Sequence, residues 1–157
     1  MADTTPVPAL DPGVFVYLAR ERERNRLAEE IRPANKAALF DELQAAGITS
    51  VLVAFDGCGD SGQIEEVHAW AGEDAAELPR ADVEMATPAW EGGVDRITMS
   101  ARVAIEQLAY DCLERTHGGW EDNEGAYGEF TFDVAARTIT LDYNERYIEI
   151  ASEQHEF

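Results

Sequence analysis

The stretch Tyr127–Tyr143, which reads YGEFTFDVAARTITLDY, decides the fold class of this chain. Its two halves alternate apolar and polar residues on either side of a VAAR turn, with apolar side chains at Phe130, Phe132, Ile139, Leu141 and Tyr143. Successive side chains of a strand point to opposite faces, so this alternation predicts two antiparallel strands. One face of the pair is apolar and the other carries threonines and acids, which is typical of a sheet covered on one side.

The neighbouring segments extend this sheet. In RYIEIA (146–151) two isoleucines alternate with Tyr147 and Glu149, which predicts a further strand. The run ITSVLVAF (48–55) is apolar at both sets of alternating positions, so it predicts a central strand covered on both faces. The run QIEEVHAW (63–70) follows a glycine-rich loop and predicts the return strand.

Three helices are expected on the apolar face of the sheet. Apolar residues at helical spacing predict them over Val14–Ile31, Ala34–Ala46 and Ser100–His117. Pro33 is expected to separate the first two, because a proline inside a helix removes a hydrogen bond and clashes with the preceding turn. Residues 72–99, rich in proline and glycine, indicate only a short strand near Val83.

These elements predict an α+β fold. We expect a two-layer sandwich in the order ααββαββ, with an antiparallel sheet of four to five strands and about three helices on one face. The prolines of residues 1–13 predict a flexible leader, and residues 14–157 have the size and apolar content of a single domain.

Charge is the most unusual property of the composition. The 157 residues include 32 acidic and 12 basic side chains, for a formal net charge of −20. Residues 1–36 hold six acids and six bases, so the whole net charge lies in residues 37–157. Phosphate groups and anionic lipids are bound by cationic surfaces. The charge therefore argues against direct binding of nucleic acid or of an anionic membrane.

The sequence also predicts a cytoplasmic protein. Its two cysteines, Cys58 and Cys112, are fewer than a secreted domain of this size usually carries. The N-terminal residues lack the basic and apolar regions of a signal peptide. The longest largely apolar run, Gly47–Phe55, is less than half of the length that a membrane helix needs, about 20 residues.

Two loops combine glycines with carboxylates and amides, and so could hold a hard cation. They are DGCGDSG (56–62), which continues to Glu66, and GGWEDNEG (118–125). If both loops lie at the same end of the sheet, a Mg²⁺ or Ca²⁺ ion could be bound by Asp56, Asp60, Glu121, Asn123 and Glu124. The spacing does not fit an EF-hand. The alternative is that both loops are solvated turns whose glycines serve only the backbone geometry.

No catalytic residue is predicted. The string GDSG (59–62) resembles the nucleophile motif of chymotrypsin-like proteases, but all three histidines follow Ser61, which reverses the chain order of that family. The cysteines and histidines lack the spacing of a zinc site, and the sequence contains neither a Walker A motif nor a GxGxxG motif.

Three strings together resemble one family. They are FDGCGDSGQIEE (55–66), GGWEDNEGAYGEFTFDVAARTITLDYNERY (118–147) and SEQHEF (152–157). They are similar to a family of unknown function that is encoded on alphaproteobacterial plasmids and integrative elements, and the resemblance covers roughly residues 30–157. It implies a cytoplasmic accessory protein of mobile DNA, and it carries no activity, cofactor or catalytic residue.

We therefore predict a non-enzymatic, acidic protein-binding accessory module of mobile DNA. Electrostatic, DNA-mimic-like binding to a host-defence or DNA-processing partner is one form of this hypothesis. The predicted partner-binding residues are Trp120, Glu121, Asp122, Glu124, Glu129, Asp133 and Asp142. Trp120 is either an exposed aromatic anchor or a lid over the core.

Two other functions stay open. One is a divalent-metal-dependent enzyme or metal-gated module that uses the loops 56–66 and 118–125 with Mg²⁺ or Ca²⁺. The other is a structural or regulatory subunit whose helix over residues 14–31 docks on another protein. The sequence predicts no oligomeric state.

Overall fold

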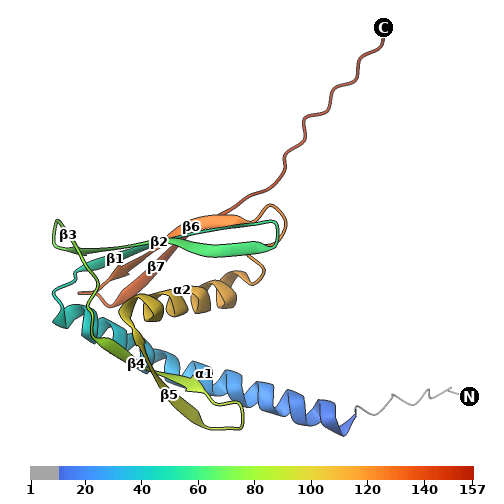
Figure 1. The fold of residues 1–157 in the computed structure, drawn as a ribbon. Coiled ribbons are helices and arrows are strands. Elements are labelled where there is room, and N and C mark those ends of the chain that lie inside the picture. Colours follow the sequence, from blue (N-terminus) through green and yellow to red (C-terminus); the bar gives the residue numbers. More distant parts are fainter. Residues whose placement is uncertain (1–10) are drawn as a thin grey trace, which may run out of the picture.

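The computed structural model describes residues 11–157, which form two helices and seven strands (Figure 1). In chain order the elements are α1 (Pro12–Ala45), β1 (Ser50–Cys58), β2 (Ser61–Ala71), β3 (Asp74–Ala76), β4 (Asp82–Pro88), β5 (Val94–Ser100), α2 (Ala101–His117), β6 (Ala126–Asp133) and β7 (Thr138–Glu145). Five strands form one antiparallel sheet in the order β3-β2-β1-β6-β7, and β4 pairs with β5 in a separate hairpin. The predicted α+β class and antiparallel sheet are confirmed.

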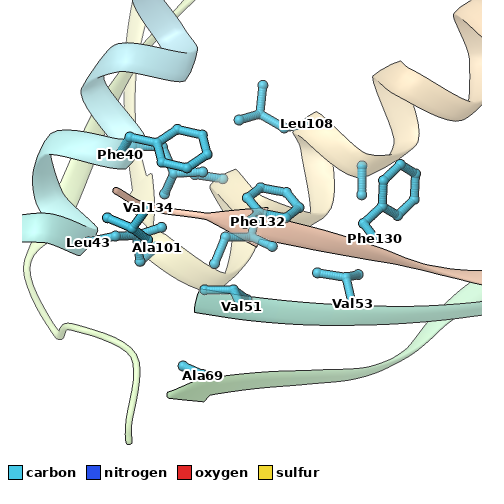
Figure 2. Packing of buried hydrophobic residues seen from close by; sticks show 14 of the residues in the cluster. Phe40, Leu43, Val51, Val53, Ala69, Ala101, Leu108, Phe130, Phe132 and Val134 are labelled. Atoms are coloured by element: carbon cyan, nitrogen blue, oxygen red, sulfur yellow. The ribbon is translucent and has the colours of Figure 1, made fainter. Parts of the chain in front are cut away.

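The core lies between the sheet and the two helices. Figure 1 shows α2 along one face of the sheet, with α1 and the hairpin beyond it. Figure 2 shows the packing of apolar side chains from β1, β6, α1 and α2, and the phenyl rings of Phe40 and Phe132 stack with centroids 6.0 Å apart. The predicted apolar stripe of α2 is confirmed, since Ala101, Ala104, Ile105, Leu108 and Ala109 are all buried.

One long helix replaces the two that Pro33 was expected to separate, so that prediction was wrong. Pro33 is exposed, and the carbonyl group that loses its hydrogen bond can therefore be solvated. Contacts made by residues before and after Pro33 hold the helix against α2 and β4. The Asn35 side chain exchanges two hydrogen bonds of 2.8 Å with the backbone of Ala86, and Arg32 donates to Asp111 at 3.0 Å. These tertiary contacts offset the penalty of the proline.

The predicted order ααββαββ was also wrong, since the elements follow the order αβββββαββ. Residues 82–100 form the two strands of the β4–β5 hairpin, where only a short strand was expected. Val83 and Met85 of β4 reach the core, whereas β5 is exposed almost throughout and so lacks the apolar alternation of a half-buried strand. Residues 146–151, expected to be a strand, have no regular structure.

The beginning of the described chain is a well-capped helix. The Asp11 carboxylate accepts a hydrogen bond of 2.9 Å from the backbone N–H of Gly13, and Pro12 occupies the first helical turn. The last two residues of the predicted leader 1–13 thus belong to α1, and its residues 1–10 lie outside the described residues. Over residues 11–157 neither helix combines the length and the apolar character that crossing a membrane requires.

The strand β1 is central in the sheet, as predicted, but it is not covered on both faces. Its side chains Val51, Val53 and Phe55 are buried against the helices. Leu52 and Ala54, which point the other way, are only partly buried, because both described helices lie on the first face. The second face of the sheet is consequently open.

Candidate functional site

The open face of the sheet carries a row of carboxylates. Glu66 on β2, Ala54 on β1, Glu129 on β6 and Asp142 on β7 are partners in register across four strands. All three acidic residues are exposed. Glu129 and Asp142 lie directly opposite each other, a position in which like charges destabilise a sheet. The stability of the sheet does not explain this row.

The charge of this face is largely unneutralised. Asp133 lies on the same face as Glu129, four residues further along β6. Within the described part of the chain, Glu66 has a partner in His68, at 3.1 Å, while Glu129, Asp133 and Asp142 form no ion pair. We call the four acids Glu66, Glu129, Asp133 and Asp142 the acidic face. Three of them belong to the predicted partner-binding set, and sequence reasoning missed Glu66.

The two glycine-rich loops meet at one end of this sheet. The end of β1 pairs with the start of β6, so that Gly57 is the partner of Ala126. The backbone N–H of Gly59 donates to the carbonyl oxygen of Asn123, and that of Asp60 donates to the carbonyl oxygen of Glu121, both at 3.0 Å. The loops 56–62 and 118–125 are therefore one hydrogen-bonded unit, as the metal-site hypothesis required.

Trp120 is the lid over this end of the core. Its side chain is 5 % exposed and meets the Phe55 ring edge to face, with centroids 5.5 Å apart. Gly57 and Gly62 leave room for the indole, because a Cβ at either position would lie within 2.6 Å of it. Of the two interpretations of Trp120, the structure favours the lid. The other loop residues of the predicted partner-binding set, Asp122 and Glu124, are exposed, and Glu121 is partly buried.

Arg146 ties the end of β7 to this unit. Its guanidinium donates to both carboxylate oxygens of Asp56, at 2.9 and 3.1 Å, and to the carbonyl oxygen of Gly57 at 3.2 Å. It also lies 4.6 Å from the centroid of the Tyr127 ring. The bond to Asp56 raises the pKa of Arg146 above its ordinary value. Sequence reasoning missed Arg146, although it is the single arginine or lysine after Arg137 in a strongly acidic segment.

Residues 31–157, which include the whole sheet, α2 and the second half of α1, match a family of unknown function (DUF6878). The chain belongs to this family. Comparison with curated proteins and with solved structures found no match. The resemblance to a family of unknown function is thus confirmed, while the origin on plasmids and mobile elements stays a prediction.

The five predicted metal ligands are close in the fold but are not arranged as a coordination sphere. The carboxylate of Asp56 accepts hydrogen bonds from the Arg146 guanidinium, and the backbones of Asp60 and Asn123 adopt positive φ in their turns. One carboxylate oxygen of Glu121 is buried without a hydrogen-bond partner. Over residues 11–157 no three histidine, cysteine, aspartate or glutamate side chains are grouped so that they could hold a metal ion. Binding of Mg²⁺ or Ca²⁺ stays a prediction.

Proposed function

We propose that this chain is a non-enzymatic, acidic protein-binding module that acts in the cytoplasm as an accessory of mobile DNA. The row of Glu66, Glu129 and Asp142 across the uncovered face of the sheet is the observation that carries this proposal. The resemblance to mobile-element proteins supports the biological setting. The binding partner would present a basic surface, as proteins that bind nucleic acid do.

Electrostatics supports the acidic face as the contact surface. Neighbouring strands lie about 5 Å apart, so the backbone positions of the row are separated by about 5 Å from Glu129 to Asp142, about 10 Å from Glu66 to Glu129 and about 15 Å from Glu66 to Asp142. A net charge of −20 steers a basic partner toward the chain and makes binding sensitive to salt. A rigid array of carboxylates can occupy the cationic surface of a nucleic-acid-binding protein as phosphates do. DNA mimicry is one form of the proposal.

Neutralising the row should weaken binding of a basic partner at low salt. The probe is a fluorescent deca-arginine peptide, followed by anisotropy over a series of NaCl concentrations. We expect Glu66→Gln/Glu129→Gln/Asp142→Asn to bind the peptide at least about tenfold more weakly than the unmodified chain, with a shallower dependence on salt.

The matched control removes the same number of charges elsewhere. Glu77, Asp95 and Glu114 are exposed, lie outside the sheet face and form no ion pair within the described residues. We expect Glu77→Gln/Asp95→Asn/Glu114→Gln to bind nearly as well as the unmodified chain. Equal loss in both variants would show that only the net charge matters, and no binding by the unmodified chain would contradict the proposed function.

The alternative, a divalent-metal-dependent enzyme or metal-gated module, is favoured by one observation, the convergence of the loops 56–62 and 118–125. Thermal unfolding at fixed ionic strength, with and without Mg²⁺, Ca²⁺ and Mn²⁺, tests it. An ion that binds only the folded state must raise the midpoint by mass action. We expect a small rise that NaCl reproduces. A rise selective for one cation that Asp60→Ala abolishes and Asp95→Ala preserves would favour the metal site instead.

A further inference from the structure

The first half of α1 extends away from the core of the domain. Figure 1 shows this half of the helix projecting beyond the sheet and α2, and the fully buried residues of α1 all lie in its second half. The run Val14–Leu18 is apolar all the way round the helix and is 40–57 % exposed. A helix that is apolar on every side is normally buried. This end of α1 therefore has the character of a contact surface, and it lies outside the matched family region 31–157.

One face of α1 is free from Phe15 to Pro33. At 100° per residue, the side chains of Phe15, Leu18, Arg22, Asn25, Glu29 and Pro33 point to the same side of the helix. All six are exposed, on the side away from Arg24, which stacks on Trp90 of the hairpin. Further along the helix the same side carries Phe40 and Leu43, which are buried in the core. This set of six residues is called the outer stripe below.

The charges of the outer stripe lack partners within their own helix. Elsewhere on α1, Arg24 pairs with Glu21, and Arg26 pairs with Glu23 and Glu30. Among the described residues, neither Arg22 nor Glu29 takes part in an ion pair. The two are seven residues apart, about 10 Å along the axis, which is too far for them to reach each other.

An antiparallel second copy would satisfy both charges at once. If two α1 helices cross so that Arg22 of one copy meets Glu29 of the other, two-fold symmetry forms the same pair a second time. The same register places Leu18 opposite Pro33, and Phe15 opposite the aliphatic stem of Lys36. A Leu18–Pro33 contact then lies at each end of the pair, with two Arg–Glu bridges in the middle. We propose that two copies of this chain associate through the outer stripe in this antiparallel register.

The distribution of charge favours this surface over any other for self-association. Residues 37–157 carry the whole net charge of −20, so two copies repel each other strongly elsewhere. Residues 1–36 are neutral, and they contain the whole outer stripe. The acidic face lies on the opposite side of the sheet from α1 and stays free in such a dimer. The inference is thus independent of the proposed function.

A charge swap within one chain tests the register. The molar mass of the full chain is measured by sedimentation equilibrium from micromolar to millimolar concentration. We expect the unmodified chain to form a dimer. We expect Arg22→Glu or Glu29→Arg alone to weaken the dimer by at least about tenfold, since each places like charges opposite each other twice. The double variant Arg22→Glu/Glu29→Arg should restore the dimer, because the exchanged charges again meet across the two-fold axis.

Arg20→Glu is the matched control. It makes the same change of charge on the same helix, but Arg20 lies on the other side of α1, beside Tyr17 and Trp90. We expect it to leave the dimer unchanged. Circular dichroism confirms that each variant is folded. A full chain that stays monomeric at millimolar concentration overturns the proposal. The proposal is also overturned if Arg20→Glu dimerises as weakly as Arg22→Glu, or if the double variant dimerises no more tightly than the single variants.

Discussion

Gly125→Ala is expected to destabilise the chain by about 3–5 kcal/mol, or to prevent folding. Gly125 has φ +76°, a conformation that alanine adopts only with strain. A Cβ there would also lie 1.7 Å from the carbonyl oxygen of Gly57 and 2.5 Å from its carbonyl carbon. Both are backbone atoms. The hydrogen bond from Gly59 to Asn123 fixes the two loops against each other, so neither backbone can move aside.

Urea unfolding of Gly125→Ala and Gly47→Ala separates the cost of the backbone strain at positive φ from the cost of the overlap with the Gly57 carbonyl group. Gly47 has nearly the same backbone conformation, with φ +77°, but a Cβ there would meet no atom within 4 Å. Gly47→Ala should therefore cost only the strain of the positive φ, about 1–2 kcal/mol. If both variants lose the same stability, the loops do not approach each other as closely as the structure shows.

Trp120→Ala is expected to lower the free energy of unfolding by about 3–5 kcal/mol, since truncation of a buried aromatic side chain leaves a large cavity. The indole fills the space above Gly57 and Gly62 and packs against Phe55. Neither glycine has a side chain that could fill this cavity. The loss is measured by denaturant unfolding, and near-ultraviolet circular dichroism should also lose the signal of the packed indole.

Trp90→Ala is the control for the removal of an indole. Trp90 is 63 % exposed at the tip of the β4–β5 hairpin, where the Arg24 guanidinium lies 4.3 Å from the centroid of its ring. We expect this variant to lose less than about 1 kcal/mol, since a cation–π contact at an exposed site contributes about 0.5–1 kcal/mol. A larger loss from Trp90→Ala than from Trp120→Ala would mean that Trp120 is not the lid of the core.

The elements that local periodicity specifies strongly were predictable. The alternation of Phe130 and Phe132 with polar residues matches β6, and the stripe from Ala101 to Ala109 matches α2. Both elements bury one face, so the pattern of burial is present in the sequence itself. The β5 strand had no such signal, because almost all of its side chains are exposed and only its pairing with β4 makes it a strand.

Two predictions were wrong because the outcome depended on contacts with distant parts of the chain, which were present at Pro33 and absent at residues 146–151. Pro33 should end a helix, but Asn35 and Arg32 hold the following turns against β4 and α2. The residues 146–151 have the alternation of a strand, but the sheet offers them no partner within the described chain. The backbone hydrogen bonds of a strand come from a neighbouring strand, so the alternation alone was not sufficient.

The candidate site divides in the same way. The sequence by itself determined the acidic character of the chain, the alternation that turns Glu129, Asp133 and Asp142 to one face, and the two glycine-rich loops. Only the tertiary structure decided that Glu66 completes the row, that the loops meet and that Asp56 belongs to Arg146. Side-chain direction follows from local backbone geometry, which a sequence pattern encodes. Contacts between residues far apart in the chain depend on strand order and register, which no local pattern encodes.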